Sequence, residues 1–112
     1  MPSKVKTTFA VPSSLKNDLQ QYVIKDNYGL RGKSKWVSEA IEKLLVLKTY
    51  PDLVTYSDEM HGFDGIETIV IEYALKLKLD KAILQIRKEH PTLEGVKSRI
   101  IRTAILQRII RS

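Results

Sequence analysis

The chain has 112 residues, of which 43% are hydrophobic, and it carries 19 Lys and Arg against 13 Asp and Glu, with no cysteine. This length suits one compact domain, and no apolar run approaches the ~20 residues that a membrane span requires. Without cysteine the chain can form no disulfide, thiolate metal site or thiol nucleophile. The N-terminal residues show no apolar signal segment, so we expect a cytoplasmic protein that does not enter a membrane.

The net charge of +6 is unevenly distributed. Residues 1–48 contain 9 basic and 4 acidic side chains, residues 49–66 contain 4 acidic and no Lys or Arg, and residues 67–112 contain 10 basic and 5 acidic. Two basic segments that flank an acidic connector favour a polyanionic partner such as nucleic acid. A charged surface that only keeps the protein in solution explains the same counts equally well.

The first segment predicts a strand followed by two helices. Residues 4–11 alternate between two faces, which is the period of a half-buried strand, and Pro12 ends it. The next apolar residues recur at helical spacing, at Leu15, Leu19, Tyr22 and Val23. Gly29 and Gly32 then indicate a turn, after which we expect Ser34 to cap a second helix. The broad apolar face of that helix is formed by Trp36, Val37, Ala40, Ile41, Leu44 and Leu45.

The same order recurs 64 residues later without a gap, because residues 34–41 align with residues 98–105 and Leu15 aligns with Leu79. Two amphipathic helix pairs can also resemble one another by chance, since they share a period. In this alignment the inward residues of the second strand are Ile69, Ile71, Tyr73 and Leu75. A helix should then end at His90-Pro91, and a last helix should begin at Lys97 or Ser98. We expect that helix to leave three side chains open to water or phosphate: Arg99, Arg102 and Arg108.

The connector, residues 49–65, is too apolar for a flexible tether, and we expect it to contain a short helix that packs against the core. Asp58, Glu59, His61 and Asp64 could hold a cation, but an acidic solvated segment is the simpler explanation. The chain's other histidine, His90, lies far from His61, and no nucleophile motif or glycine-rich phosphate loop accompanies either residue. We therefore expect neither an enzyme nor a cofactor.

A lone strand with two helices cannot satisfy its strand edge or bury its apolar faces, so two such units must pair. The predicted fold is mainly α with a two-stranded antiparallel ribbon. The first unit covers residues 1–48, the acidic connector covers residues 49–65, and the second unit covers residues 66–112. One chain would then form a tandem pseudo-dimer of two strand-helix-helix units, active as a monomer, with further association on DNA left open.

Residues 4–45, with the strand sequence KVKTTFAVP and the second-helix sequence GKSKWVSEAI, resemble the ribbon-helix-helix family of the Arc and MetJ repressors. The second unit is similar only in register and over residues 98–105, and it lacks the proline that follows the first strand. Two such units in one chain are similar to the tandem arrangement of TraY-like proteins of conjugative DNA processing. The resemblance implies binding to double-stranded DNA, with the ribbon in the major groove.

The same resemblance implies two groups of site residues. Outward strand side chains would read base edges: Lys4, Lys6, Thr8, Thr68, Val70 and Glu72. The starts of the second helices would bind phosphate: Gly32, Lys33, Ser34, Lys35, Lys97, Ser98 and Arg99. Glu72 could accept from cytosine N4, or it could pair with Lys4 or Lys6 across the ribbon. The helix starts could also be ordinary N-caps with solvated lysines.

The expected function is sequence-specific DNA binding, as a transcriptional repressor or as an accessory factor of DNA processing. In a rival DNA-binding mode, the helix in residues 97–111 would lie lengthwise in the groove, as in a helix-turn-helix protein. The apolar content of that segment argues against this mode. An interaction protein such as an antitoxin is a third class, for which no partner-binding tail is evident. Trp36 could stack on a base, but its spacing with Ala40 and Leu44 favours the core.

Overall fold

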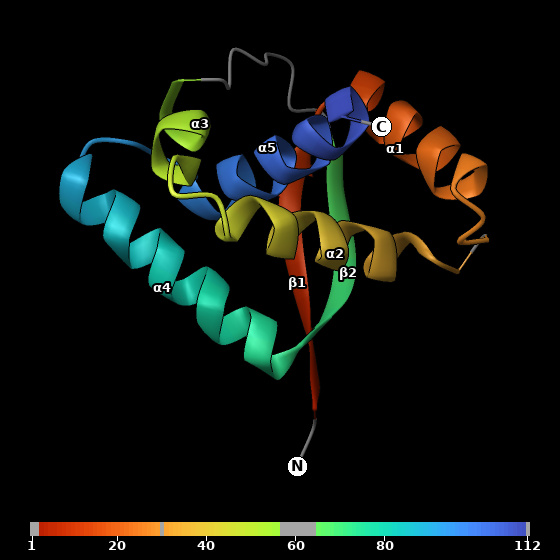
Figure 1. Ribbon diagram of the computed structural model, residues 1–112, viewed down its shortest axis with the longest axis horizontal. Coiled ribbons are helices and arrows are strands. Elements are labelled where there is room, and N and C mark those ends of the chain that lie inside the picture. Colours follow the sequence, from red (N-terminus) through yellow and green to blue (C-terminus); the bar gives the residue numbers. More distant parts are fainter. Residues whose placement is uncertain (1–2, 30, 57–64, 112) are drawn as a thin grey trace.

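The computed structural model describes residues 3–29, 31–56 and 65–111. Within these ranges, two strands and five helices follow one another in the order strand, helix, helix, short helix, strand, helix, helix (Figure 1). Their bounds are β1 Lys4–Val11, α1 Ser13–Lys25, α2 Lys33–Leu45, α3 Tyr50–Tyr56, β2 Gly65–Glu72, α4 Tyr73–Glu89 and α5 Val96–Arg111. The predicted coarse fold class, mainly helical with a two-stranded antiparallel sheet, is confirmed.

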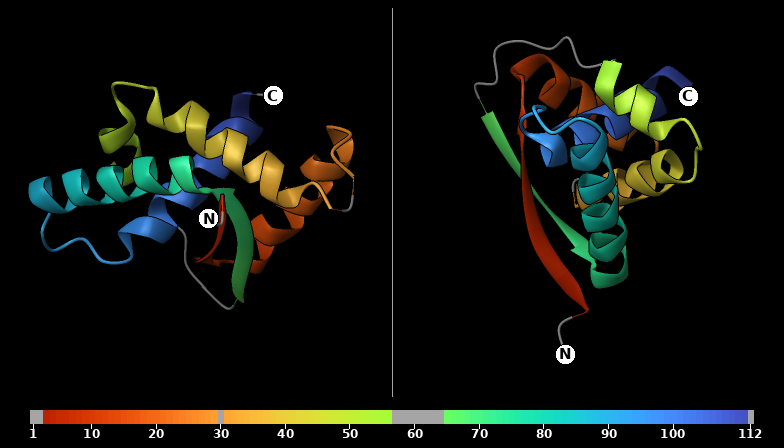
Figure 2. Two further views of the ribbon diagram at one scale, coloured as in Figure 1. Left: turned by 90° about the horizontal axis from the view of Figure 1, so that it is seen from below. Right: turned by 90° about the vertical axis from the view of Figure 1, so that its left-hand side faces the viewer.

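The two strands pair antiparallel over their whole length, from Lys4 opposite Glu72 to Val11 opposite Gly65. Thr8 lies opposite Thr68 near the middle. Side chains alternate across the sheet: Phe9, Val11, Ile69 and Ile71 are buried on the inner face. The helices lie on that inner side, and none of the described helices covers the other face of the sheet (Figure 2, right).

The core lies between the inner face of the strands and the helices. Its largest fully buried side chains come from both halves of the chain and include Trp36, Ile41, Ile100 and Ile105. Helices α2 and α5 pack against each other across the middle of the molecule (Figure 1). Alone, each half would leave these apolar faces in water, so packing α2 on α5 joins the two halves into one folded unit.

The expectation that Tyr73 and Leu75 continue the second strand is wrong. Helix α4 begins at Tyr73, whose side chain is half exposed, and Leu75 is buried from the first turn of that helix. Strand pairing ends at Glu72, which lies opposite Lys4. After it, the Tyr73 N–H still donates to the carbonyl of Ser3 at 2.8 Å, but Tyr73 already begins the helix. The backbone then satisfies its polar groups within a helix. The buried spacing of Leu75, Leu79, Ala82 and Ile86 is helical.

This earlier start also overturns the ungapped alignment of the two halves. Helix α4 begins 60 residues after α1 begins, but it ends 64 residues after α1 ends, because it has 17 residues where α1 has 13. The buried residues Leu15 and Leu19 of α1 therefore correspond to Leu75 and Leu79 of α4 rather than to Leu79 and Ile83. The buried positions of α2 recur in α5 at a spacing of 64 residues, for example at Trp36 and Ile100, which are both fully buried.

The connecting segment contains the short helix α3, in which Val54 is fully buried. The four acidic and histidine residues considered as a cation site, Asp58, Glu59, His61 and Asp64, lie outside the described residues. Across the ranges that the structure covers, no helix is both long and apolar enough to cross a membrane.

Candidate nucleic-acid interface

All six residues predicted to read bases lie on the uncovered face of the sheet. Alternation along β1 exposes Lys4, Lys6 and Thr8, and alternation along β2 exposes Thr68, Val70 and Glu72. Because the strands are antiparallel, Lys6 lies opposite Val70 and Thr8 opposite Thr68. The result is a narrow two-stranded surface with polar side chains at its centre and lysines towards one end. We call this surface the β-ribbon face.

Apolar side chains also occupy the β-ribbon face. Ile66 is 72% exposed and Val70 is 38% exposed, and Ile66 lies opposite the half-buried Ala10. Ile66 was missing from the predicted set, although strand alternation counted back from Val70 and Thr68 would have placed it on the same face. One end of the face is therefore aliphatic and the other basic.

Glu72 pairs with Lys4 across the strands. The Lys4 Nζ lies 3.9 Å from Glu72 Oε1, and both side chains are more than half exposed. This is the ion pair considered above as an alternative to cytosine readout. An exposed pair of this kind contributes at most about 1 kcal/mol, so it can open when a better partner approaches.

At the start of α2, the Ser34 hydroxyl contacts the strand rather than capping the helix. Ser34 Oγ accepts the N–H of Val70 at 2.9 Å, and the N-cap residue is Gly32, so the predicted capping role of Ser34 is wrong. Gly32 is buried, its N–H donates to Gly29 O, and a Cβ there would overlap Tyr28. Glycine is thus required for the turn that lets α2 begin at Lys33.

A hollow beside this helix start joins it to the β-ribbon face. We call it the ribbon-end hollow; it is lined by Lys4, Arg31, Ser34, Lys35, Val70 and Glu72. Arg31 was not among the predicted site residues, because its place in a glycine-rich turn gave no structural signal. Lys35 is exposed and lies 6.0 Å from the ring centre of Tyr28. Three cations against one carboxylate make this hollow attractive to an anion.

Lys33 is engaged by an acid within the protein. Glu67 is only 7% exposed on the inner face of β2, and its carboxylate forms ion pairs with Lys33 and, at 3.2 Å, with Lys16. Burial by itself raises the pKa of Glu67, but the hydrogen bonds and charges of Lys33 and Lys16 outweigh it and hold the pKa below its ordinary value. The structure thus places Lys33 in an internal ion-pair cluster instead of leaving it free for phosphate.

The start of α5 repeats the serine contact. Ser98 Oγ accepts the N–H of Ala10 at 3.0 Å, which ties α5 to β1 as Ser34 ties α2 to β2. Lys97 lines a second hollow together with Lys6, Thr7, Lys76 and Asp80; we call it the lysine hollow. Arg99, by contrast, donates to the carbonyl of Thr55 at 3.0 Å and so anchors the end of α3.

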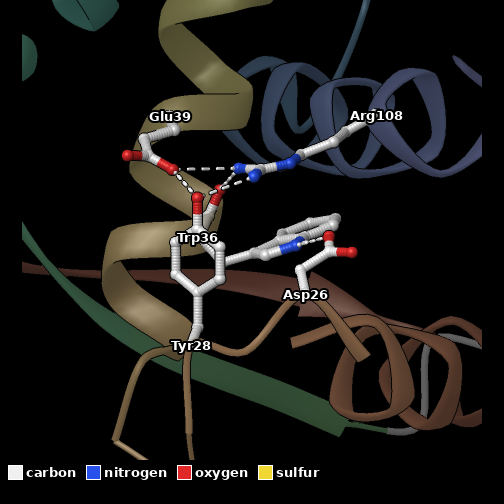
Figure 3. Close-up of polar contacts among 5 residues, drawn as sticks. All are labelled: Asp26, Tyr28, Trp36, Glu39 and Arg108. Atoms are coloured by element: carbon white, nitrogen blue, oxygen red, sulfur yellow. Dashed lines mark hydrogen bonds and ion pairs between the residues drawn. The ribbon is translucent and has the colours of Figure 1, made fainter. Parts of the chain in front are cut away.

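Contrary to the expectation, Arg102 is buried and Arg108 is mostly buried, and both donate hydrogen bonds within the protein. Arg102 is 4% exposed and donates to the Ala10 carbonyl at 2.8 Å. Arg108 donates to the carbonyl of Trp36 at 2.7 Å and lies over the Trp36 ring at 4.4 Å (Figure 3). The apolar pattern of α5 did not reveal these contacts, because their acceptors lie on distant segments.

Trp36 is fully buried, which agrees with its predicted place in the core. Its indole N–H donates to Asp26 at 2.8 Å, and Tyr28 and Glu39 complete the cluster around Arg108 (Figure 3). The hydrogen bond from Tyr28 lowers the pKa of Glu39, against the opposing effect of burial, and Arg108 adds to this. A buried ring enclosed by these groups cannot stack on a base.

Across the described ranges, no group of three or more His, Asp or Glu side chains is arranged to hold a metal ion. Comparisons with protein-family models, curated proteins and solved structures find no match to this chain. Functional inference therefore depends on the geometry of the β-ribbon face and the two helix starts.

Proposed function

We propose that this protein binds double-stranded DNA sequence-specifically, with the β-ribbon face in the major groove. The observation that carries the proposal is the uncovered face itself, which exposes two lysines, two threonines and two aliphatic side chains on paired strands. A two-stranded ribbon fits the major groove, and these side-chain types match its donors, acceptors and thymine methyl groups. Exposed aliphatic residues such as Ile66 also gain a partner in such a complex.

The two helix starts support this proposal because they flank the ribbon. Backbone N–H groups in the first turn of a helix have no intrahelical acceptor, and the helix dipole adds partial positive charge. The serine contacts fix the start of α2 beside β2 and the start of α5 beside β1. In a DNA complex, the two helix starts would bind phosphates and so position the protein, and the β-ribbon face would read the bases.

We infer further that the two halves form a single-chain pseudo-dimer. If β1 and β2 are superimposed with an offset of 60 and α2 and α5 with an offset of 64, Ala10 corresponds to Val70 and Ser34 to Ser98. The bond from Val70 to Ser34 then corresponds to the bond from Ala10 to Ser98. The approximate two-fold axis passes through the opposed pair Thr8 and Thr68. The extra turn of α4 absorbs the difference between the two offsets.

This symmetry gives the two half-sites different chemistry. On one side of the central threonines lie Lys6 and Val70, and on the other lie Ile66 and Ala10. Lys6 can donate to guanine O6 or N7, whereas Ile66 and Ala10 can contact only thymine methyl groups. We therefore propose an asymmetric site with a guanine in one half and thymines in the other.

The structure argues against α5 as a recognition helix. Seven of its residues are buried, and its start is bonded to β1 through Ser98. A helix that forms the core of the domain cannot also lie lengthwise in the groove. A cytoplasmic regulator of transcription and an accessory DNA-processing factor both remain compatible with the proposed binding mode.

The decisive experiment is selection of bound duplexes from a random pool, followed by footprinting of the selected site at moderate salt. We expect one protected site, bound at least about 1,000-fold more tightly than random DNA. Lys6→Ala should lose the preference. The matched control is Lys88→Ala, because Lys88 is exposed near the C-terminal end of α4, and this end of the helix lies away from the strands (Figure 1). Equal affinity of the wild type for selected and random duplexes would refute sequence-specific binding.

A further inference from the structure

Two identical lysine pairs occupy corresponding places in the two halves. Lys16 and Lys33 correspond to Lys76 and Lys97, with the offset of 60 in the first helices and 64 in the second. The strand residue that faces each pair differs between the halves. Lys16 and Lys33 hold Glu67 of β2, whereas Lys76 and Lys97 line the lysine hollow with Thr7 of β1, the counterpart of Glu67.

In the first half, the lysine pair already binds an anionic group. The Glu67 carboxylate reaches both ammonium groups, and its lowered pKa is a direct effect of this arrangement. The cluster is therefore a working anion site whose ligand is supplied by the protein.

In the second half, no strand carboxylate takes that place. Thr7 is neutral and half-buried, and Lys97 has no ion-pair partner among the described residues. Lys76 does pair with Asp80 at 2.7 Å, but the hollow also receives Lys6 from the β-ribbon face. Three lysines against one aspartate leave the lysine hollow with an excess of positive charge.

We propose that the lysine hollow binds a phosphate group, held by Lys76 and Lys97 where their counterparts hold the Glu67 carboxylate. The hollow adjoins Lys6 and Thr8 of the β-ribbon face, so a backbone phosphate beside the groove is the ligand that its position favours. That assignment to DNA rests on the proposed function; the phosphate site itself does not. The protein would then bind the DNA backbone unequally on the two sides of the ribbon, because the Glu67 carboxylate occupies the corresponding site between Lys16 and Lys33.

The test exchanges the two strand residues. Thr7→Glu should supply an internal carboxylate to Lys76 and Lys97 and close the site, and Glu67→Thr should open a second one beside Lys16 and Lys33. Inorganic phosphate is titrated at low salt while NMR follows backbone amides and lysine side chains. The wild type should show saturable shifts around Thr7 and Lys97, Thr7→Glu should show none, and Glu67→Thr should show an additional set. Lys97→Gln provides a second variant if Thr7→Glu does not fold, and Lys88→Ala is the control.

A DNA arm distinguishes the source of the phosphate. Thr7→Glu and Lys97→Gln should each lower the salt dependence of DNA affinity by about one unit, on selected and random duplexes alike. Phosphate shifts with unchanged DNA binding would support the site but assign it to free phosphate. Wild-type protein that shows no saturable phosphate shifts would overturn the site even if DNA binding is intact, whereas shifts without any DNA binding would refute only the proposed function.

Discussion

The Ser98 hydroxyl accepts the backbone N–H of Ala10 although the two residues are 88 positions apart. In the same way, the Ser34 hydroxyl at the start of α2 accepts the N–H of Val70. The first bond is partly buried and the second is exposed, so water can replace the Ser34 hydroxyl more easily than the Ser98 hydroxyl.

We therefore predict unequal losses of stability on removing the two hydroxyls. Ser98→Ala should lower the free energy of unfolding by about 1–3 kcal/mol, because the Ala10 N–H is left without an acceptor in a partly buried place. Ser34→Ala should cost less, about 0.5 kcal/mol, since water can reach the Val70 N–H. Urea denaturation followed by circular dichroism measures both values. Equal losses would show that the two contacts are energetically equivalent.

The ion-pair cluster of Glu67 predicts a component of stability that depends on pH. The pKa of this carboxyl is lowered in the folded protein, so its contribution is present above the ordinary value of 4.5 and is lost as the pH falls through the folded-state pKa. Glu67→Gln should be less stable than the wild type at pH 7, and the difference should shrink below about pH 4.5. Melting temperatures from pH 7 to pH 3 test this. The exposed Glu94→Gln serves as control, and a difference that grows on acidification would contradict the assignment.

Trp36→Ala should lower the free energy of unfolding by about 3–5 kcal/mol before any DNA is added. The reason is that the change empties a fully buried site and removes the ring on which Arg108 lies. Denaturation followed by circular dichroism is the appropriate measurement, because Trp36 is the chain's single tryptophan and the variant has no indole fluorescence. Unchanged stability together with lost DNA binding would move Trp36 to the interface.

Readout and positioning residues should respond differently to DNA sequence. Lys6→Ala or Thr8→Ala should cost about 1–3 kcal/mol on the selected site and little on random DNA. Lys35→Ala should weaken both and lower the salt slope by about one unit. Fluorescence anisotropy titrations at several salt concentrations separate these effects. Equal losses on both DNAs for Lys6→Ala would argue against base contact by the β-ribbon face.

A single-chain ribbon predicts a binding site without two-fold symmetry. The β-ribbon face presents Lys6 in one half and Ile66 in the other, so the two halves cannot read the same bases. Light scattering of the free protein should give a monomer, and the shortest bound duplex should be non-palindromic. An obligate dimer that requires an inverted repeat would refute the single-chain arrangement.

Local patterns were sufficient to predict most of the secondary structure. Strand alternation in residues 4–11 and helical spacing around Trp36 gave the correct elements, because each depends on residues close in sequence. The start of α4 was mispredicted, since residues 75–79 alternate as well as they fit a helix. The helix forms from Tyr73 because strand pairing ends where Glu72 meets Lys4. This is a tertiary contact between distant residues, so the local sequence pattern does not reveal it.

The candidate site was predictable only in part for a similar reason. Outward strand positions follow from alternation, so Lys6 and Thr68 were placed on the correct face. Whether a basic side chain is free depends on what the fold brings to it. Lys33 meets Glu67 from a strand 34 residues away, and Arg102 meets a carbonyl 92 residues away.

The pairing of β1 with β2 also determines when the protein can fold during synthesis. Strand β1 is made before all of these partners, because it pairs with residues 65–72 and its side contacts come from Ser98 and Arg102. At the ribosome's rate of about 5–20 residues per second, Phe9 and Val11 remain without their native neighbours for several seconds. The residues of β1 thus leave the ribosome well before their partners, and a nascent chain exposes an unpaired strand edge throughout that interval.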